Sequence, residues 1–315
     1  MSRITRRALG FAALAGLVLV SAAPSIAVAQ EKVVRMGNQK VGAYALMKAR
    51  GILEERLKPL GYTVTWKEFP SGPQLLEGVK AGMVDFAHSG DAPPIFAQAA
   101  GAPLLYIGHE PAAPKGEAII VPRDSPIKTV ADLKGKKIAL NKGSNVHYLL
   151  VRALEKAGLK YTDVELAYLP PAGGRAAFEK GDVDAWVIWE PYRTSAEMSL
   201  GARTVADGTD LVSNYEFFFT TKTFFEAHPQ IVEVVLGAAR DVYAEAAKDI
   251  RGTAKTFSAA AGFPESVMEV ALSRRNFDIL PISSSVIAEQ QRIADTFKDL
   301  GLISTAIKVS DAANK

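Results

Sequence analysis

The chain has 315 residues, with 37 Lys and Arg against 34 Asp and Glu, and it contains no cysteine. The missing cysteines exclude disulfides, thiol catalysis, a cysteine-based metal site and a lipid-anchoring cysteine. Three basic residues lie within the first 29 positions, which leaves 34 residues of each sign in the remainder. A net charge near zero argues against a nucleic acid partner and against a polybasic membrane surface.

Residues 1–29 have the pattern of a signal peptide. Arg3, Arg6 and Arg7 precede an apolar run over residues 8–20, and Ala27-Val28-Ala29 offers small side chains where signal peptidase needs them. The run is too short for a retained transmembrane helix. We therefore expect a removed signal peptide and a periplasmic mature protein. Paired arginines are common in ordinary signals, so the Sec route is favoured over the Tat route.

Apolar runs of strand length alternate with helix-period segments over the first two thirds of the mature chain, a pattern typical of α/β proteins. The runs lie at residues 33–37, 63–69, 84–88, 103–108, 117–122, 136–141, 164–169 and 184–189. From about residue 222 the pattern becomes nearly continuous helix. The alternating part is therefore followed by a mainly helical part.

One pattern occurs twice, about a hundred residues apart. Residues 80–87 are echoed by residues 180–186, and the strand-like run 33–36 with its polar loop is echoed by residues 137–145. Two similar halves predict two doubly wound α/β lobes with a cleft between them.

Residues 113–212 are flanked on both sides by segments that must belong to another lobe. We predict a discontinuous first lobe, residues 30–112 and 213–315, with a second lobe, residues 113–212, inserted into it. The chain would cross twice between the lobes, and two crossings make a hinge.

Ligands of open α/β sheets bind at the carboxyl ends of the strands, where loops lead into helix N-termini. In both lobes this rule selects the loops at residues 38–42, 88–93, 142–145 and 189–192, which hold small, amide and hydroxyl residues. Helix N-termini bind anions through free N–H groups and the helix dipole. The candidate ligand-binding residues are Gln39, Ser89, Gly90, Asp91, Ser144, Asn145, His147, Trp189, Glu190 and Tyr192.

Several of these residues have a second interpretation. Ser144 and Asp91 also suit helix caps, a role that is favoured for Asp91 because a bare carboxylate repels an anion. His147 lies one turn into its helix, where a structural hydrogen-bonding role is favoured over ligand contact. Trp189 could be a core residue or a pocket wall.

Catalytic patterns are hard to find. The four histidines lack metal-ligand spacing, and the chain has no nucleophile elbow and no phosphate-binding loop. Ser144 and His147 have no evident third partner for a triad. We therefore expect no enzyme activity, no metal and no cofactor.

Long motifs resemble the aliphatic sulfonate-binding proteins of ABC transporters, over essentially the whole mature chain. The motifs are residues 68–77, the block Gly-Asp-Ala-Pro-Pro-Ile-Phe-Ala-Gln within 89–101, residues 125–135, residues 142–147, and residues 183–192. Glu190 stands where an aspartate is also familiar, and residues 273–276 lack a histidine found in other members. These departures leave the substrate preference open.

The resemblance implies a periplasmic binding protein of type II that captures an alkanesulfonate and delivers it to a membrane permease, acting as a monomer. A sulfonate carries no proton at biological pH, so a ring of donors suits it and disfavours hydrogen phosphate. The alkyl tail needs an apolar wall, for which Trp189, Tyr192 and either Tyr215 or Phe217 are candidates.

Two alternatives remain. Within the same class, the ligand could be taurine, nitrate or another small anion, and a carboxylate of Glu190 facing the tail would favour an aminosulfonate. From another class, the chain resembles in architecture the pyrimidine synthases of thiamine biosynthesis. Those enzymes use a cysteine-rich motif, which the lack of cysteine and the export signal contradict.

Overall fold

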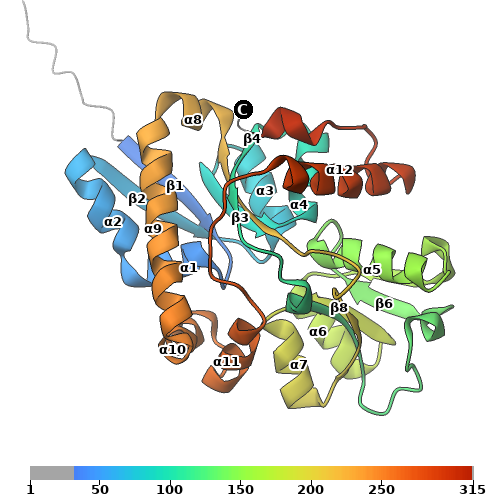
Figure 1. The fold of residues 1–315 in the computed structure, drawn as a ribbon. Coiled ribbons are helices and arrows are strands. Elements are labelled where there is room, and N and C mark those ends of the chain that lie inside the picture. The colour runs from blue at the N-terminus through green and yellow to red at the C-terminus, as the bar shows by residue number, and fades with distance from the viewer. Residues whose placement is uncertain (1–31, 314–315) are drawn as a thin grey trace, which may run out of the picture. The chain divides into compact units, whose positions relative to one another are not determined.

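The computed structural model describes residues 32–313, which form one compact unit built on two five-stranded sheets (Figure 1). The predicted signal peptide lies outside the described residues. Among the helices within them, none is long and apolar enough to cross a membrane.

The first sheet has the strand order β2-β1-β3-β10-β4, and β10 runs antiparallel to both of its neighbours. Its strands are β1 (Lys32–Asn38), β2 (Tyr62–Glu68), β3 (Phe86–Gly90), β4 (Leu104–His109) and β10 (Glu216–Thr221). The second sheet has the order β7-β6-β8-β5-β9, with β5 antiparallel to its neighbours. Its strands are β5 (Glu117–Val121), β6 (Lys137–Leu140), β7 (Glu165–Tyr168), β8 (Ala185–Trp189) and β9 (Arg203–Asp207). The repeated sequence pattern thus corresponds to two sheets of one topology.

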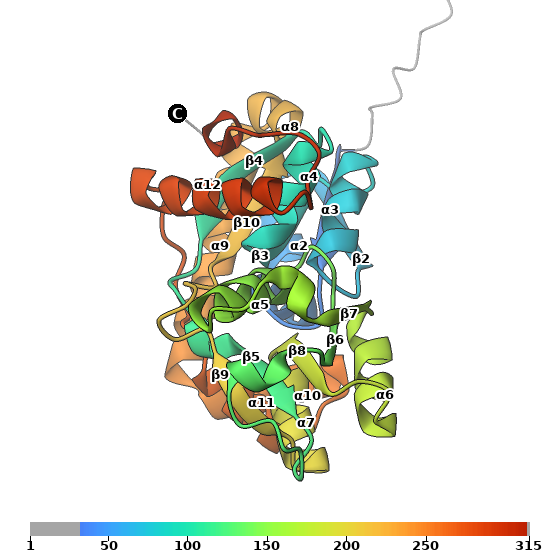
Figure 2. The same cartoon turned by 90° about the vertical axis from the view of Figure 1, so that its right-hand side faces the viewer.

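Helices cover both faces of each sheet. On the first sheet, α1 (Ala43–Arg50) and α9 (Pro229–Lys248) lie on one face, and α3 (Gly72–Lys80), α4 (Ala92–Ala99) and α12 (Ser284–Asp299) on the other (Figure 1). On the second sheet, α5 (Asn145–Lys156) covers one face, and α6 (Pro171–Lys180) and α7 (Tyr192–Leu200) cover the other (Figure 2). The remaining helices are α2 (Ile52–Leu57), α8 (Lys222–Ala227), α10 (Ile250–Ala261) and α11 (Glu265–Ser273).

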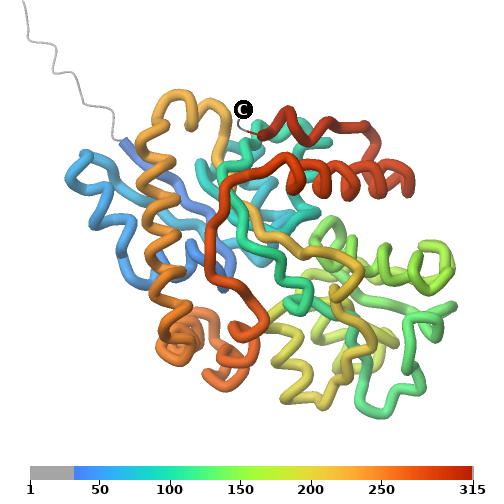
Figure 3. Tube along the Cα trace, in the orientation of Figure 1, coloured from blue at the N-terminus to red at the C-terminus, as the bar shows by residue number. Residues whose placement is uncertain are grey.

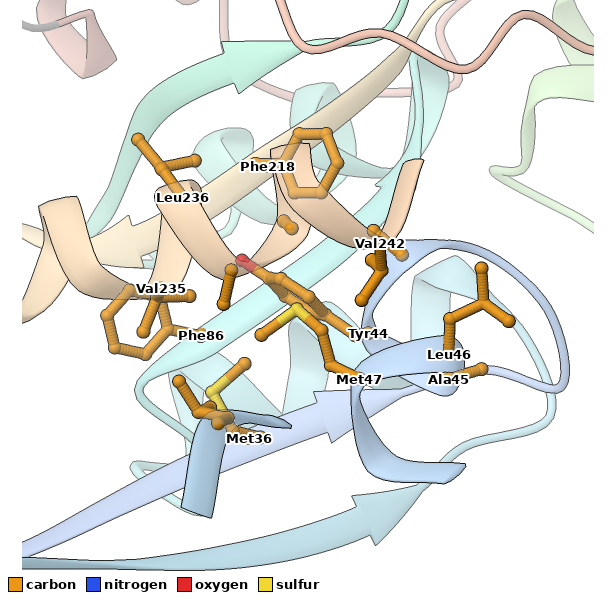
Figure 4. Packing of buried hydrophobic residues seen from close by; sticks show 14 of the residues in the cluster. Met36, Tyr44, Ala45, Leu46, Met47, Phe86, Phe218, Val235, Leu236 and Val242 are labelled. Atoms are coloured by element: carbon orange, nitrogen blue, oxygen red, sulfur yellow. The ribbon is translucent and has the colours of Figure 1, made fainter. Parts of the chain in front are cut away.

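The core of the first lobe is apolar on both faces of its sheet. In β10, Phe218 packs with Tyr44 and the helices on one face, while Phe217 and Phe219 pack on the opposite face, because successive side chains of a strand alternate. Figure 4 shows Phe218, Tyr44 and Leu236 in the first of these clusters. Helix α1 ends where Gly51 adopts φ +66°, which separates α1 from α2.

Two chain segments connect the sheets and are paired by hydrogen bonds (Figure 3). The amide of Glu110 donates to the carbonyl of Glu216 at 2.7 Å, and the amide of Ala113 donates to the carbonyl of Ser213 at 3.0 Å. The side chain of Asn214 adds a bond of 2.9 Å to the carbonyl of Ala113. The fold is therefore two doubly wound α/β lobes joined by two crossings, as the sequence predicts.

Candidate ligand-binding site

A cavity of about 50 Å³ lies where the loops after β1 and β8 meet the two crossing segments. Five of the ten predicted site residues line it: Gln39, Asn145, Trp189, Glu190 and Tyr192. The cavity also has charged and polar lining residues from outside the predicted set, namely Lys40, His88, Glu110, Asn214, Glu216 and Arg275. The loops chosen from the sequence thus form about half of the wall.

A buried ion cluster forms the wall on the side of the first sheet. Nε2 of His88 lies 2.7 Å from Oε1 of Glu110, and Nη2 of Arg275 lies 2.9 Å from Oε2 of the same carboxylate. The Tyr243 hydroxyl also donates to Glu110. Burial alone would raise the pKa of Glu110, but Arg275, His88 and Tyr243 together hold it at about 2. Glu110 is therefore an ionised and fully partnered carboxylate.

Glu190 is likewise committed to partners within the protein. Its Oε1 lies 2.5 Å from Nη1 of Arg274, and its Oε2 accepts a hydrogen bond of 3.1 Å from the backbone amide of Thr194. Arg274 also contacts Glu197 at 2.9 Å. Because Arg274 follows α11 and Glu190 precedes α7, this ion pair connects the two lobes. Glu190 thus accepts from one backbone amide in the first turn of α7.

The N-terminus of α5 meets the first lobe through Asn145. Its Nδ2 donates to Glu117 at 2.7 Å and to Asn214 at 2.9 Å. Gly90 approaches it closely, since a Cβ built on Gly90 would lie only 3.0 Å from Cβ of Asn145. A side chain at this position would press on Asn145, which would have to shift by a few tenths of an ångström.

The other predicted residues lie around the cavity without lining it: Ser89, Gly90, Asp91, Ser144 and His147. Ser144 is the N-cap residue of α5, but its hydroxyl donates to the carbonyl of Asn141 at 2.7 Å. The hydroxyl of Ser89 donates to the carbonyl of Gly90 at 3.2 Å. Both hydroxyls therefore have partners within the protein.

Asp91 stands at the N-cap position of α4 and is only 2% exposed, but its side chain makes no capping hydrogen bond, contrary to the role that the sequence favoured. Burial raises its pKa to about 8, with further contributions from Glu216 and Glu289. Its Oδ1 is buried without a hydrogen-bond partner among residues 32–313. Glu117 is similar: burial, Asp91 and Glu216 raise its pKa.

His147, in the first turn of α5, is fully buried and does not line the cavity. Its Nδ1 accepts a hydrogen bond of 3.2 Å from the amide of Gly143, and its Nε2 lies 2.6 Å from the hydroxyl of Tyr161. Burial, and secondarily Lys142, lower its pKa to about 4. A neutral ring with both nitrogens occupied suits the structural role that the sequence favoured for this residue.

An aromatic surface adjoins the cavity on the side of the second lobe. The rings of Trp189 and Tyr192 meet edge to face with centroids 6.2 Å apart, and Tyr192 meets Phe263 at 5.3 Å. Phe263, in the connection between α10 and α11, carries no signal in the sequence that marks it for this position. Trp189 and Tyr192 line the cavity and supply an apolar wall, while Phe263 packs against Tyr192.

Comparison with known proteins assigns the chain to a family. A family model described as NMT1/THI5 like matches residues 61–250. The structure of the alkanesulfonate-binding protein SsuA from Xanthomonas axonopodis pv. citri bound to MOPS is similar at 41% identity and a TM-score of 0.86, covering 91% of this chain and 99% of that one. The chain belongs to the aliphatic sulfonate-binding proteins of the NMT1/THI5-like family.

Two further relatives are binding proteins by name. The periplasmic aliphatic sulphonate binding protein SsuA from Escherichia coli is 40% identical, with a TM-score of 0.83, and the match covers 90% of this chain and 92% of that one. The taurine-binding periplasmic protein of Escherichia coli (strain K12) is 28% identical over 188 residues, which are 58% of each chain. The family and the fold predicted from the sequence motifs are therefore confirmed.

Proposed function

We propose that this protein is a periplasmic receptor that binds an aliphatic sulfonate between its two lobes and delivers it to the permease of an ABC importer. The observation that carries the proposal is a cavity at the strand ends of both lobes in a chain similar, at 41% identity, to an alkanesulfonate-binding protein along nearly its whole length. The receptor is exported by its signal peptide, acts as a monomer and is a binding protein, not an enzyme.

The lining residues suit a ligand with an anionic head and an apolar tail. Gln39, Asn145 and Arg275 line the cavity with side chains that carry N–H groups. Nε2 of Gln39 donates to the carbonyl of His88 at 3.1 Å, Nδ2 of Asn145 donates to Glu117 and Asn214, and Nη2 of Arg275 donates to Glu110. A sulfonate, which accepts from donors alone, would exchange with some of these bonds on binding. Trp189 and Tyr192 offer the apolar surface for the tail. Ser89 and Ser144 do not line the cavity and hold nearby loop backbone through their hydroxyl hydrogen bonds. Gly90 leaves room for Asn145.

The two lobes are residues 30–112 with 213–315, and residues 113–212, and they close on the ligand by rotation about the two crossings. Support comes from β10, which follows the second sheet in the chain and completes the first. A receptor signals its loaded state only if the ligand binds the open and closed forms differently. Saturating ligand is therefore expected to reduce the radius of gyration measured by small-angle scattering.

A thermal-shift panel tests the ligand class. Methane-, ethane-, butane- and octanesulfonate are compared with taurine, sulfate, nitrate and phosphate. A sulfonate at one hundred times its Kd adds about 2.7 kcal/mol to the free energy of unfolding, and the inorganic anions are expected to add nothing. Stabilisation by nitrate or sulfate and by no sulfonate would refute the proposal.

A further inference from the structure

Three carboxylates line the cavity, and two of them have strong partners within the protein. Glu110 binds Arg275, His88 and Tyr243. Glu190 binds Arg274 and the amide of Thr194. The negative charge of each is already balanced by a guanidinium, Arg275 for Glu110 and Arg274 for Glu190.

Glu216, the third carboxylate, differs from both. It begins β10, lines the cavity and has a side chain 23% exposed. Its nearest basic group is Nε2 of His88, at 3.6 Å from Oε2, and that same nitrogen lies 2.7 Å from Glu110. Within residues 32–313 the carboxylate of Glu216 takes part in no hydrogen bond shorter than this contact.

The other cations of the wall are directed elsewhere. Nζ of Lys40 donates to the carbonyl of Ala261 at 3.1 Å, and Arg275 faces Glu110. The pKa of Glu216 is raised by burial and by Glu110, against the opposing effect of His88 and Arg275. A carboxylate in this position gains from any cation that enters the cavity.

We propose that Glu216 determines ligand specificity by accepting a hydrogen bond from a protonated amine, so that the preferred ligands are sulfonates that also carry an ammonium group. This inference rests on the proposed function. The sulfonate head meets the polar wall near Gln39 and Asn145, and the ammonium group meets Glu216. Glu190, the carboxylate that the sequence suggested for this role, has both oxygens occupied.

The test uses two ligands of nearly equal shape. 3-Aminopropane-1-sulfonate and butane-1-sulfonate differ only by the exchange of NH₃⁺ for CH₃ at the end of the tail. Isothermal titration calorimetry at pH 7 measures both with the wild-type protein, with Glu216→Gln and with Glu165→Gln. Glu165 lies on β7, exposed and far along the chain from the cavity-lining residues, so its variant removes one charge without touching the site.

A charge-assisted hydrogen bond contributes about 1.5–3 kcal/mol, so the wild-type protein is expected to bind the aminosulfonate at least about tenfold more tightly than butane-1-sulfonate. The ratio of the two affinities falls to about one in Glu216→Gln and is unchanged in Glu165→Gln. Thermal unfolding of each variant establishes that it is folded before the titration.

The contrary outcomes are distinct. Equal affinity of the wild-type protein for the two ligands overturns the inference and leaves the proposed function intact. A preference for the aminosulfonate that survives in Glu216→Gln also overturns it, because another group must then bind the amine. If neither ligand nor any other sulfonate binds, the proposed function itself fails. If Glu216→Gln does not fold, Glu216→Asp takes its place, and equal affinities of the wild-type protein for the two ligands overturn the inference without any variant.

Discussion

The buried ring of His147 makes the stability of the protein depend on pH in a predictable direction. In the folded state burial lowers its pKa from 6.5 to about 4, while in the unfolded chain the ring titrates near its ordinary value. As pH falls below 6.5, His147 becomes protonated in the unfolded state but stays neutral in the folded state. The contribution of this residue is therefore complete above pH 6.5 and is lost between 6.5 and about 4.

The magnitude follows from the same two values. The difference between 6.5 and about 4, at about 1.4 kcal/mol for each pKa unit, gives a total of about 3.5 kcal/mol, of which about 2 kcal/mol is already lost at pH 5. Other groups titrate as well, so the comparison is between the wild-type protein and His147→Gln at each pH. Whatever the variant costs at pH 8, that cost should shrink by about 2 kcal/mol at pH 5.

Urea unfolding at pH 8 and pH 5, followed by circular dichroism, measures this difference. A cost of His147→Gln that is the same at both pH values would refute the assignment of a neutral buried ring. The structure also separates this residue from binding, because its nitrogens contact Gly143 and Tyr161. At each pH the sulfonate affinity of the wild-type protein is divided by that of His147→Gln. This ratio should change by less than about threefold, or about 0.7 kcal/mol, between pH 5.5 and 8.5. A tenfold advantage of the wild type that appears only at pH 5.5 would make the histidine a ligand contact.

Two further predictions concern the connection between the lobes and the glycine beside the cavity. Arg274→Met leaves the buried carboxylate of Glu190 without its closest partner and should lower the free energy of unfolding in urea by about 2–3 kcal/mol. Arg56→Met breaks an exposed ion pair and should lower it by less than about 1 kcal/mol. Equal losses in the two variants would contradict the role of Arg274. Gly90→Val adds atoms next to Asn145 and should weaken sulfonate binding at least about tenfold in calorimetry. Gly173→Ala should leave the affinity unchanged, because a Cβ at that position has its nearest neighbour at 3.5 Å. Unchanged affinity in Gly90→Val would exclude Gly90 from the site.

Local sequence patterns predicted the elements that have a regular period. All eight apolar runs correspond to strands β1 to β8, because each lies between turn or helix signals. The run Phe217-Phe218-Phe219 in β10 was missed as a strand, since both of its faces are buried and it shows no alternation. β9 is a half-buried edge strand with a weak apolar pattern.

Local sequence patterns also predicted only some of the residues that line the cavity. Gln39, Asn145 and Trp189 follow strand ends and could be selected by a rule about sheets. Glu110 and Glu216 come together because the two crossing segments pair with each other, the amide of one residue bonding the carbonyl of the other. That pairing joins positions more than a hundred residues apart, and no local pattern encodes it.

The position of β10 in the first sheet has a consequence for the order of folding. All strands of the second sheet come from one continuous stretch, residues 117–207, whereas the first sheet needs β10, residues 216–221, between β3 and β4. Closing that long loop is entropically costly and slow. When the chain emerges from its N-terminus onward, the second sheet can assemble as soon as its own residues are free, while the first lacks β10 and therefore cannot yet join β4 to β1, β2 and β3. Folding intermediates are therefore expected to protect the amides of the inserted half before those of the half that contains the N-terminus.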